Sequence, residues 1–528
     1  MTQAVKLIDK VRRGVQSVAY GNPLYQKILA SGDAPERLFF TPADPWPGDA
    51  AAGQSIISGQ TSMFERGESP ALRHAAAALR NLRAVGTPNA SAAAVRLIEG
   101  WLDAFDGWHD TEWMPDRLGA RIAAWIGFYD FYAPAASASF TPRLVASLHR
   151  QFKHLVRTIS PSLTETAAID AARGLIYGGL NFPEGDAALG LACDFLQRQI
   201  AAEILPDGGH ASRNPAAQLH ILRHLVDIRN VFELAGIRLP ENIGLGLSAM
   251  IPALKFYRHG DGGLGLFHGA SEETPLLIDA VLTQASTRGR VLRRLPETGY
   301  ERLTAGRSLL LVDAGAPPPR ALGAQGHAGL LSFEFSAGRE RIIVNCGGAP
   351  ESSNGGWRAA CAATAAHSTL TVADTNACDI GEDGGIDGTA QVAAQRFEEG
   401  GVYGVEMSHD GYRSRFGLTH HRMLRLSGDG ETLAGRDILQ GKGGREFSLR
   451  WHLHPGVQAA LSEGGTALLR TPSGGGWRLR VEGKPVAIET SVYCGGPAPR
   501  RTLQAKISSI TNAGDTAVTW GLTRERKS

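Results

Sequence analysis

The sequence predicts a multi-domain protein of α and β type, in which an all-helical N-terminal region is followed by a C-terminal antiparallel β-sandwich. Three observations support this prediction. The chain has 528 residues, well above the roughly 100–200 residues of a usual domain, so more than one domain is expected. Apolar residues recur at three- and four-residue spacing as far as about Leu282. From about Gly299 onward, short β-branched and aromatic segments replace that pattern.

The helical region consists of amphipathic segments separated by short breaks rich in Gly, Pro, Ser and Asn. Each segment must bury its apolar face against a neighbour, as helices do in helix-pair solenoids and (α/α) toroids. We expect this domain over residues 71–298, preceded by an irregular N-terminal arm over residues 1–70. The segments are ALRHAAAALRNLRAV, AAAVRLIEGWLDAF, ARIAAWIGFYDFY, LVASLHRQFKHLVRTI, AAIDAARGLIYGGL and DAALGLACDFLQRQIAAEIL.

The second region, over residues 299–528, has the composition of a strand series. Its segments are short and are bounded by Gly or Asp, and no long helical pattern interrupts them, so a large antiparallel sandwich is expected. The segments are RSLLLVDAG, GLLSFEFSAG, RERIIVNCG, HSTLTVAD, GVYGVEMSHD, HHRMLRLSG, EFSLRWHLHPG and TAVTWGLT.

Composition excludes several classes of function. The formal net charge is +2, from 54 basic and 52 acidic residues, so no global field favours nucleic acid. The five cysteines form an odd number without CxxC spacing, which argues against a disulfide framework. The N-terminus lacks the uninterrupted run of roughly 7–15 apolar residues of a signal peptide, and no window reaches the ~18 apolar residues of a transmembrane helix. We therefore expect no export signal and no membrane anchor.

The first polar cluster is the segment ILPDGGHASRNPAAQLH, which ends one helix, turns at Asp207 and begins another helix after Pro215. His210, Arg213 and Asn214 are expected to project from this turn. The second cluster lies on three strand segments and contains His327, Asn345 or Cys346, and His367.

Two interpretations of the second cluster stay open at this point. Neutral imidazoles bind zinc, and a thiolate or carboxylate usually completes such a site. Because Asn345 is a poor zinc ligand, Cys346 would have to serve beside His327 and His367. The other interpretation, which we favour, is a metal-free hydrogen-bonded cluster of His327, Asn345 and His367.

The third cluster is GYRSRFGLTHHR, which places Tyr412, Arg413 and Arg415 ahead of a strand that contains His420. Aromatic and guanidinium groups of this kind stack on sugars and pair with carboxylates. An ordinary solvated strand face is an equally good interpretation of these residues.

The order of the two folds, together with five motifs, resembles the heparinase II/III-like family over roughly residues 70–528. The motifs are PDGGHASRNP, GHAGLLSFEF, VNCGG, WRAA with ATAAHSTLTV, and HDGY with RFGLTHHR. The resemblance implies an (α/α) toroid joined to a β-sandwich, and lyase activity on uronic-acid polysaccharides by β-elimination. In that reaction a base removes the proton beside the uronate carboxylate, and an acid protonates the departing glycosidic oxygen.

The resemblance also implies catalytic positions, several of which carry other residues in this chain. Where the family has Asn-His followed by Glu, this chain has PSLTE and retains Glu165. Ala217 and Gln218 stand where the family has Tyr-His.

The metal-binding motif is altered in the same way. The family's His-x-His-x-Asp is QGHAG here, which retains His327 as the match to a zinc ligand and puts Gln325 at the position of the candidate base. Asn345 stands in place of the Asp that completes the metal site, and His367 matches the remaining zinc-ligand histidine. The family topology also implies that His327 and His367 approach each other.

Two functions follow from these observations. The first is a lyase-like enzyme that cleaves a uronate-containing glycan, with His210 or His420 as base, Tyr412 or a water as acid, and Glu165 as a further catalytic candidate. The second is a catalytically impaired glycan-binding or cell-envelope assembly protein on the same scaffold. In both, the substrate-binding candidates are Arg213, Asn214, Gln325 and Arg358.

Partner and compartment are expectations of the same kind. The expected partner is an acidic polysaccharide or oligosaccharide, with zinc as the only cofactor considered. The resemblance implies the cell envelope or periplasm, whereas the N-terminal sequence favours the cytoplasm. A glycoside hydrolase would need two carboxylates flanking a cleft, for which the sequence offers only Asp207 and Glu165.

Overall fold

The structure is a computed structural model that describes residues 18–32, 34–59, 75–285, 290–349, 355–381 and 385–525. The chain forms two compact units that interleave along the sequence. Unit 1 takes the described residues up to 202 together with 220–247 and 279–285, and unit 2 takes 203–219, 248–278 and the described residues from 290 onward. The domain bounds predicted from the sequence, at residues 70 and 298, stay predictions.

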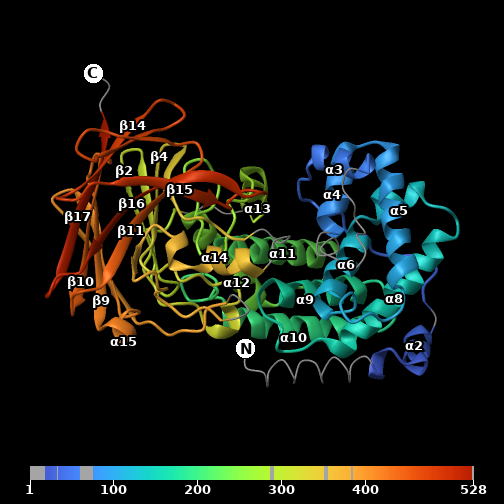
Figure 1. Ribbon diagram of the computed structural model, residues 1–528. Helices are drawn as coiled ribbons and strands as arrows, with labels where there is room; N and C mark the ends of the chain where they lie inside the picture. The colour runs from blue at the N-terminus through green and yellow to red at the C-terminus, as the bar shows by residue number, and fades with distance from the viewer. Residues whose placement is uncertain are drawn as a thin grey trace. The chain divides into compact units, whose positions relative to one another are not determined.

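Unit 1 is built of helices, and Figure 1 labels them along the chain. Pro88 and Pro115 stand at the first turns of two of them, where the missing N–H is not needed and the fixed φ suits a helix. The helices are α2 (Pro23–Ala30), α3 (Ala50–Ile57), α4 (Ala75–Val85), α5 (Pro88–Phe105), α6 (Pro115–Gly127), α7 (Tyr129–Tyr132), α8 (Phe140–Thr158), α9 (Glu165–Gly179) and α10 (Gly185–Glu203), followed by α11 (Pro215–Leu234), α12 (Glu241–Phe256) and α13 (Pro275–Gln284), which contribute to both units.

Glycines allow α6 and α9 to cross at very short range. A Cβ atom on Gly119 in α6 would lie 2.1 Å from the backbone oxygen of Asp170, and one on Gly174 in α9 would lie 2.4 Å from the Cα atom of Gly119. Neither position can therefore hold a larger residue without moving a helix backbone.

Buried polar contacts attach the chain before α3 to these helices. The Asp44 carboxylate lies 2.6 Å from the Arg80 guanidinium in α4. The Trp46 indole N–H donates to Asp227 in α11 at 2.7 Å, and Arg173 in α9 donates to the other oxygen of that carboxylate at 3.0 Å. Because each charge is paired where it is buried, the segment around Trp46 packs on the helices without a large desolvation cost.

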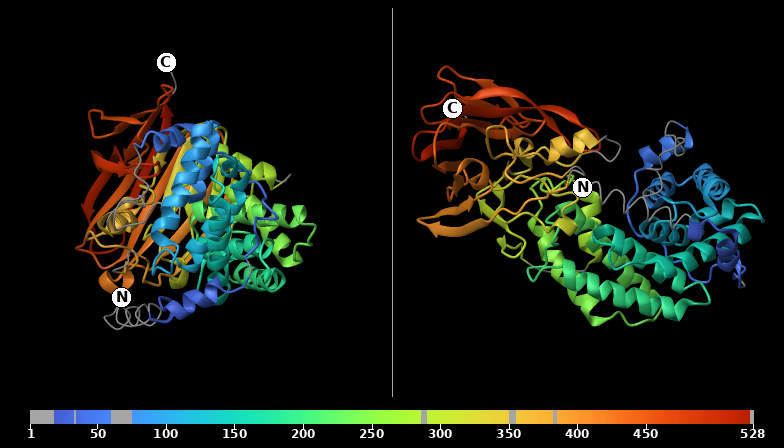
Figure 2. Two further views of the ribbon diagram at one scale, coloured as in Figure 1. Left: turned by 90° about the vertical axis from the view of Figure 1, so that its right-hand side faces the viewer. Right: turned by 60° about the horizontal axis from the view of Figure 1, so that its bottom comes forward.

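Unit 2 contains two antiparallel sheets, which Figure 2 shows from two further sides. The nine-stranded sheet has the order β1-β2-β3-β4-β5-β11-β16-β15, with β6 also paired to β11, and the eight-stranded sheet has the order β12-β13-β14-β17-β10-β9-β8-β7. The strands are β1 (Arg294–Leu295), β2 (Tyr300–Ala305), β3 (Ser308–Asp313), β4 (Phe333–Ala337), β5 (Glu340–Val344), β6 (Leu370–Val372), β7 (Val392–Glu399), β8 (Val402–His409), β9 (Leu418–Leu426), β10 (Thr432–Gly441), β11 (Glu446–Leu453), β12 (Gln458–Leu461), β13 (Ala467–Arg470), β14 (Gly476–Val481), β15 (Ala487–Tyr493), β16 (Arg500–Ile510) and β17 (Thr516–Glu525). Two short helices, α14 (Gly355–Ala362) and α15 (Arg413–Phe416), lie among them in the sequence.

Aromatic side chains join the two sheets into one core. Phe333 in β4 stacks on Trp520 in β17 with ring centroids 5.7 Å apart, and Trp451 in β11 meets the same indole edge-on at 5.3 Å. Phe335 in β4 contacts Trp477 in β14 at 5.1 Å. Each pair has one member in each sheet, and all five rings are buried, so these contacts define a sandwich.

The predicted order of folds, helices first and an antiparallel β-sandwich second, is confirmed. Each of the six helical segments singled out in the sequence overlaps one of the helices α4 to α6 and α8 to α10, and residues 71–74 of the first segment lie outside the described part of the chain. Each of the eight strand segments also overlaps a strand. In the described residues, no helix is both long and apolar enough to cross a membrane.

Gly119→Ala should lower the free energy of unfolding by about 1–3 kcal/mol, because the added methyl group overlaps the backbone of α9. Gly190→Ala, in the middle of α10, is the matched control, since a Cβ atom there meets nothing within 4 Å. This control should raise stability by roughly 0.5–1 kcal/mol through helix propensity. Denaturant melts of the full chain measure both, and equal effects of the same sign would contradict the close crossing.

Candidate functional site

The turn predicted from PDGGHASRNP is fixed by Asp207 and two glycines within unit 2. The Asp207 carboxylate accepts hydrogen bonds from the Thr298 hydroxyl at 2.7 Å and from the backbone N–H groups of Glu297 and Thr298 at 2.8 Å each. A Cβ atom on Gly208 would lie 1.9 Å from the Ala249 oxygen, and one on Gly209 would lie 1.9 Å from the Thr298 hydroxyl. The adjacent glycines are therefore required by close packing around the turn.

His210, one of the two predicted bases, lies inside this turn. Its Nε2 atom is 3.0 Å from the Glu203 carboxylate, and its Nδ1 atom is 2.7 Å from the Ser212 hydroxyl. The chain of carboxylate, imidazole and hydroxyl has the members of a hydrolytic triad, but His210 is 1% exposed and Ser212 is 3% exposed. In this conformation the three side chains hold the turn together and do not reach a substrate.

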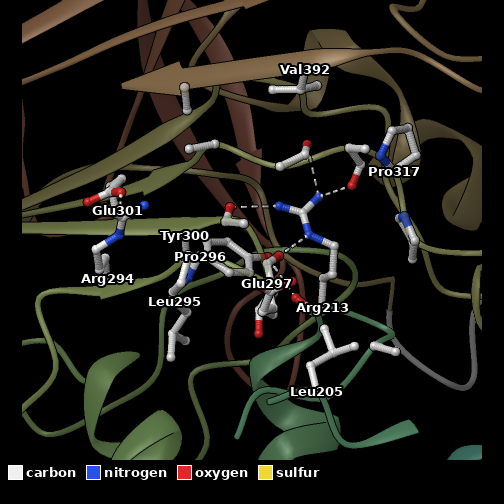
Figure 3. Close-up of a pocket in the computed structure, with 18 of the residues that line it drawn as sticks. Leu205, Arg213, Arg294, Leu295, Pro296, Glu297, Tyr300, Glu301, Pro317 and Val392 are labelled. Atoms are coloured by element: carbon white, nitrogen blue, oxygen red, sulfur yellow. Dashed lines mark hydrogen bonds and ion pairs between the residues drawn. The ribbon is translucent and has the colours of Figure 1, made fainter. Parts of the chain in front are cut away.

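Arg213 is the centre of a buried hydrogen-bond network (Figure 3). Its guanidinium donates to the Asp313 carboxylate at 2.6 Å, to the Thr298 oxygen at 2.7 Å and to the Ala316 oxygen at 2.7 Å. It also donates to the Gly299 oxygen at 3.0 Å and lies over the Tyr300 ring, 4.8 Å from its centroid. The Arg213 backbone adopts the left-handed region, with φ of 60°, and its oxygen accepts a bond from the Tyr300 hydroxyl.

His268 and Asp313 complete this network with opposite effects on their pKa values. Burial alone would raise the pKa of Asp313, but the Arg213 guanidinium and the hydrogen bond from His268 outweigh it and hold that pKa below its usual value. Burial lowers the pKa of His268, so the ring is neutral. Its Nδ1 atom accepts the His327 backbone N–H, which leaves the Nε2 proton to face Asp313 at 3.3 Å.

His327 and His367 approach each other, as the sequence predicts. Nδ1 of His327 lies 3.1 Å from Nε2 of His367, and Nδ1 of His367 donates to the Ala363 oxygen at 2.8 Å. The second bond fixes the tautomer of His367, so its Nε2 atom accepts from His327. Burial lowers the pKa of His367 to about 4, and burial with the neighbouring His367 holds the pKa of His327 well below its usual value.

The residues around this histidine pair do not fit a zinc ion. No group of three His, Cys, Asp or Glu side chains in the described part of the chain is placed to hold a metal. The Cys346 thiol lies beside other residues, 3.5 Å from Nδ1 of His452 and 3.8 Å from the Ser491 hydroxyl. Asn345 uses its side-chain oxygen to accept the Ser368 N–H at 3.0 Å. The predicted ligand set of His327, His367 and Cys346 is therefore not assembled, because adjacent residues 345 and 346 face different surroundings.

The other predicted binding residues differ in how available they are. Asn214 caps α11, because its side-chain oxygen accepts the N–H groups of Ala216 and Ala217 while its amide donates to the His268 oxygen. Gln325 and Arg358 are exposed, the first in a turn and the second in α14. Contact of these two exposed side chains with a glycan stays a prediction.

His420 and Tyr412, proposed as base and acid, are both fully buried in the sandwich. His420 bonds to Asp437 at 2.8 Å and to His409 at 3.1 Å, and Asp437 also accepts from Arg422 at 2.7 Å. The Tyr412 hydroxyl donates to the Leu370 oxygen at 2.9 Å. These bonds use the atoms that proton transfer to a substrate would need, so neither residue is carried into the function proposed below.

Glu165 belongs to unit 1 and is described apart from the other candidates. It is the first residue of α9, is half-buried, and has φ of 55°.

The candidates of unit 2 fall into two clusters. The first joins the turn residues His210, Arg213 and Asn214 to His327 and His367 through His268. The second contains His420 and Tyr412.

A cavity of about 400 Å³ lies beside Arg213 in unit 2 (Figure 3). Arg294 at its wall lies 3.6 Å from the Glu301 carboxylate, which also accepts from Arg396 at 3.1 Å. Burial raises the pKa of Glu301 in spite of these arginines. Four prolines shape the wall, namely Pro296, Pro317, Pro318 and Pro319. At this wall the guanidinium groups of Arg294 and Arg396 therefore share the single carboxyl group of Glu301.

Sequence reasoning missed His268 and Asp313, and only Asp313 carried a signal in the sequence. What marks His268 is structural, since it precedes Gly269 in GLFHGA and both residues adopt positive φ, at 47° and 79°. Asp313 ends the apolar strand LLLVD and stands where an acidic residue is not expected in a buried strand. A buried aspartate of this kind calls for a cationic partner, which is Arg213.

The helices and the two sheets together have the fold of solved polysaccharide lyases. The chain superposes on heparinase III with a TM-score of 0.74 and 13% identity, over 95% of this chain and 89% of that one. It matches the heparan sulfate lyase HepC of Pedobacter heparinus with a TM-score of 0.61 and 13% identity, over 98% and 91% of the two chains. A chondroitin AC lyase of Streptomyces coelicolor, solved in complex with chondroitin sulphate, gives 0.54 and 12%, over 90% and 79%.

Sequence comparison defines the family. Residues 287–521 match the family described as heparinase II/III-like, C-terminal. The chain is also 31% identical to the FtsZ-localized protein C of Caulobacter vibrioides over 531 residues, which cover 93% of this chain and 91% of that protein. The chain belongs to the heparinase II/III-like family, and its similarity to the lyases is a similarity of fold.

Arg213→Met should lower the free energy of unfolding by about 3–5 kcal/mol, because it leaves the buried Asp313 carboxylate without its main partner. The double variant Arg213→Met/Asp313→Leu should recover part of this loss, since no buried charge then remains from the pair. Denaturant melts at neutral pH measure both variants. A double variant that is no more stable than the single one would contradict the assigned ion pair.

Stability should also fall as the pH is lowered from about 6.5 to about 4. His367 has a pKa of about 4 in the folded state, so over this range the unfolded chain binds the proton and the folded chain does not. The loss from this one group is on the order of 3 kcal/mol. His367→Gln should make the dependence of unfolding free energy on pH less steep, whereas His421→Gln, in β9 and away from this histidine pair, should leave the wild-type slope. Equal slopes in the wild type and His367→Gln would disprove a neutral, buried His367.

Proposed function

We propose that this chain is an assembly protein of the bacterial cell envelope that is localised with FtsZ and uses the lyase scaffold without β-elimination. The observation that carries the proposal is the burial of the candidate acid and base groups of unit 2. His210, His420 and Tyr412 are each at most 1% exposed.

Burial matters here because β-elimination needs two proton transfers at the substrate. A general acid or base contributes about 10²–10⁴-fold each, and it must lie within hydrogen-bond reach of the proton that it moves. The three side chains instead bond to Glu203, Asp437 and the Leu370 oxygen inside the protein. A protein that has lost both proton transfers keeps its fold and its binding surface, but it should catalyse little β-elimination.

The position that resembles the family's Tyr-His supports the same conclusion. Gln218 stands there, and its amide donates to the backbone oxygens of Gly208 and Met250 at 2.9 and 3.0 Å. Its side-chain oxygen accepts the His210 N–H at 2.8 Å. A group that would face substrate in a lyase is thus replaced by one that braces the turn.

The relative found by sequence supports the cellular role. It is similar to this chain over nearly the whole length of both proteins, and it is named for its localisation to FtsZ. Its identity to this chain is more than twice that of the superposed lyases. Assembly at the same place in the cell is therefore a better-supported role for this chain than degradation of a free polysaccharide.

Purified full-length chain should co-sediment with FtsZ polymers formed with GTP and should stay in the supernatant when GTP is omitted. The same preparation should produce no ultraviolet absorbance of unsaturated uronate on heparan sulfate, chondroitin sulfate or polyglucuronate, with heparinase III as the positive control. Absorbance that grows with time and disappears in His210→Ala would establish a lyase instead. Absence from the FtsZ pellet in the presence of GTP would contradict the assembly role.

A further inference from the structure

Three of the five cysteines, far apart in the sequence, meet in unit 2. Cys346 and Cys494 each begin a Cys-Gly-Gly turn, the first after β5 and the second after β15. The Cys494 backbone N–H donates to the Cys346 oxygen at 2.6 Å. Gly347, with φ of 85°, allows this contact, because a Cβ atom there would lie 2.9 Å from the Gly495 nitrogen. The two turns are therefore packed backbone to backbone.

Cys361, near the end of α14, adds its thiol to this pair of turns. Its Sγ atom donates to Sγ of Cys494 at 3.9 Å. A disulfide bond measures about 2.05 Å, so rotation of the two side chains has to close the remaining gap. The two thiols already face each other, which is the arrangement from which such a bond forms.

Cys346 has different partners, although it belongs to the same cluster. Its Sγ atom lies 3.5 Å from Nδ1 of His452 and 3.8 Å from the Ser491 hydroxyl. Burial raises the pKa of Cys346 to about 12, so this thiol stays protonated. The geometry thus singles out Cys361 and Cys494 as the reactive pair and leaves Cys346 as a neighbour.

We propose that Cys361 and Cys494 form a reversible disulfide when the protein meets a hydroperoxide. The Cys494 sulfur attacks one oxygen of hydrogen peroxide, and the O–O bond breaks. The departing hydroxide takes the Cys494 proton and becomes water, and Cys494 is then a sulfenic acid. The Cys361 sulfur then attacks the Cys494 sulfur, the S–O bond breaks, and the departing hydroxide takes the Cys361 proton. In total two thiols lose two electrons and two protons, and one hydrogen peroxide becomes two waters.

The order of the two steps follows from the hydrogen bond. Because Cys361 donates its S–H to Cys494, the pKa of Cys494 is lowered, and that of Cys361 is raised. Cys494 is therefore the better first nucleophile. Both thiols are buried, but α14 exposes residues 356–360 directly before Cys361, and Pro497 is exposed just after the second turn.

The bond would attach α14 covalently to the end of β15. α14 carries Trp357, a large apolar side chain that is 37% exposed. In the oxidised state the bond would restrict the motion of α14 and of the exposed Trp357 side chain, while the two sheets keep their structure. The modification would thus act on this helix alone.

The test uses the full-length reduced chain, treated with hydrogen peroxide in its folded state and then alkylated. We expect the intact mass before alkylation to fall by that of two hydrogens. On alkylation of the unfolded chain two of the five thiols should escape, and a peptide map should contain one cross-link, between Cys361 and Cys494. Dithiothreitol should restore five alkylated thiols. Five alkylated thiols after peroxide, or a cross-link that joins any other pair, would overturn the proposal.

Serine variants separate the roles within the cluster. Cys346→Ser keeps the reactive pair and should lose two alkylatable thiols like the wild type, whereas Cys361→Ser should form no intramolecular cross-link. Thermal melts of the reduced variants verify that each is folded. The peptide map of the wild-type chain tests the proposal without any variant. A wild-type map that contains no cross-link therefore contradicts the proposal even if a variant fails to fold.

Discussion

The buried ion pair between Arg213 and Asp313 is the constraint on which unit 2 depends. One guanidinium joins the turn after α10 to the end of β3 and to the segments at Thr298 and Ala316, through bonds of 2.6 to 2.7 Å. Neither charge is more than 4% exposed, so each would be costly without the other. The Asp313 carboxylate also faces His268, which accepts the backbone N–H of His327. The ion pair therefore also fixes the position of these two histidines.

Helices and strands could be predicted where their apolar residues have a clear periodicity. They could not be predicted where packing against a distant element determines the residue. β10 is an example, because TLAGRDILQG holds Gly435 at its centre and reads as a turn as easily as a strand. In the structure a Cβ atom on Gly435 would lie 2.1 Å from the Trp520 ring, so the glycine is needed to admit the indole of β17. The reason for this residue thus lies in a neighbouring strand about eighty residues further along the chain, where no local pattern shows it.

The site was harder to predict for the same physical reason. Histidine, tyrosine and arginine in a turn indicate chemistry only if they are exposed, and exposure depends on partners distant in sequence. The Tyr412 hydroxyl meets an oxygen 42 residues earlier, and Arg213 meets its carboxylate 100 residues later. The approach of His327 to His367 could be predicted because the family resemblance supplied the topology that brings their segments together. Side-chain type thus predicted where the polar clusters lie in the sequence. It did not predict that most of these side chains are buried and hold the fold together.

Asn345 explains why this core is consistent without a metal. Its backbone N–H donates to the Glu334 carboxylate at 2.9 Å, and Glu334 also faces His259 at 2.9 Å. An aspartate at position 345 would bring a second carboxylate into a fully buried space beside Glu334, and that repulsion would need a cation to offset it. The neutral amide removes the repulsion, and its oxygen still accepts the Ser368 N–H. Its Nδ2 atom has no hydrogen-bond partner among the described residues, so the core accepts one unsatisfied donor where a carboxylate would require a bound ion.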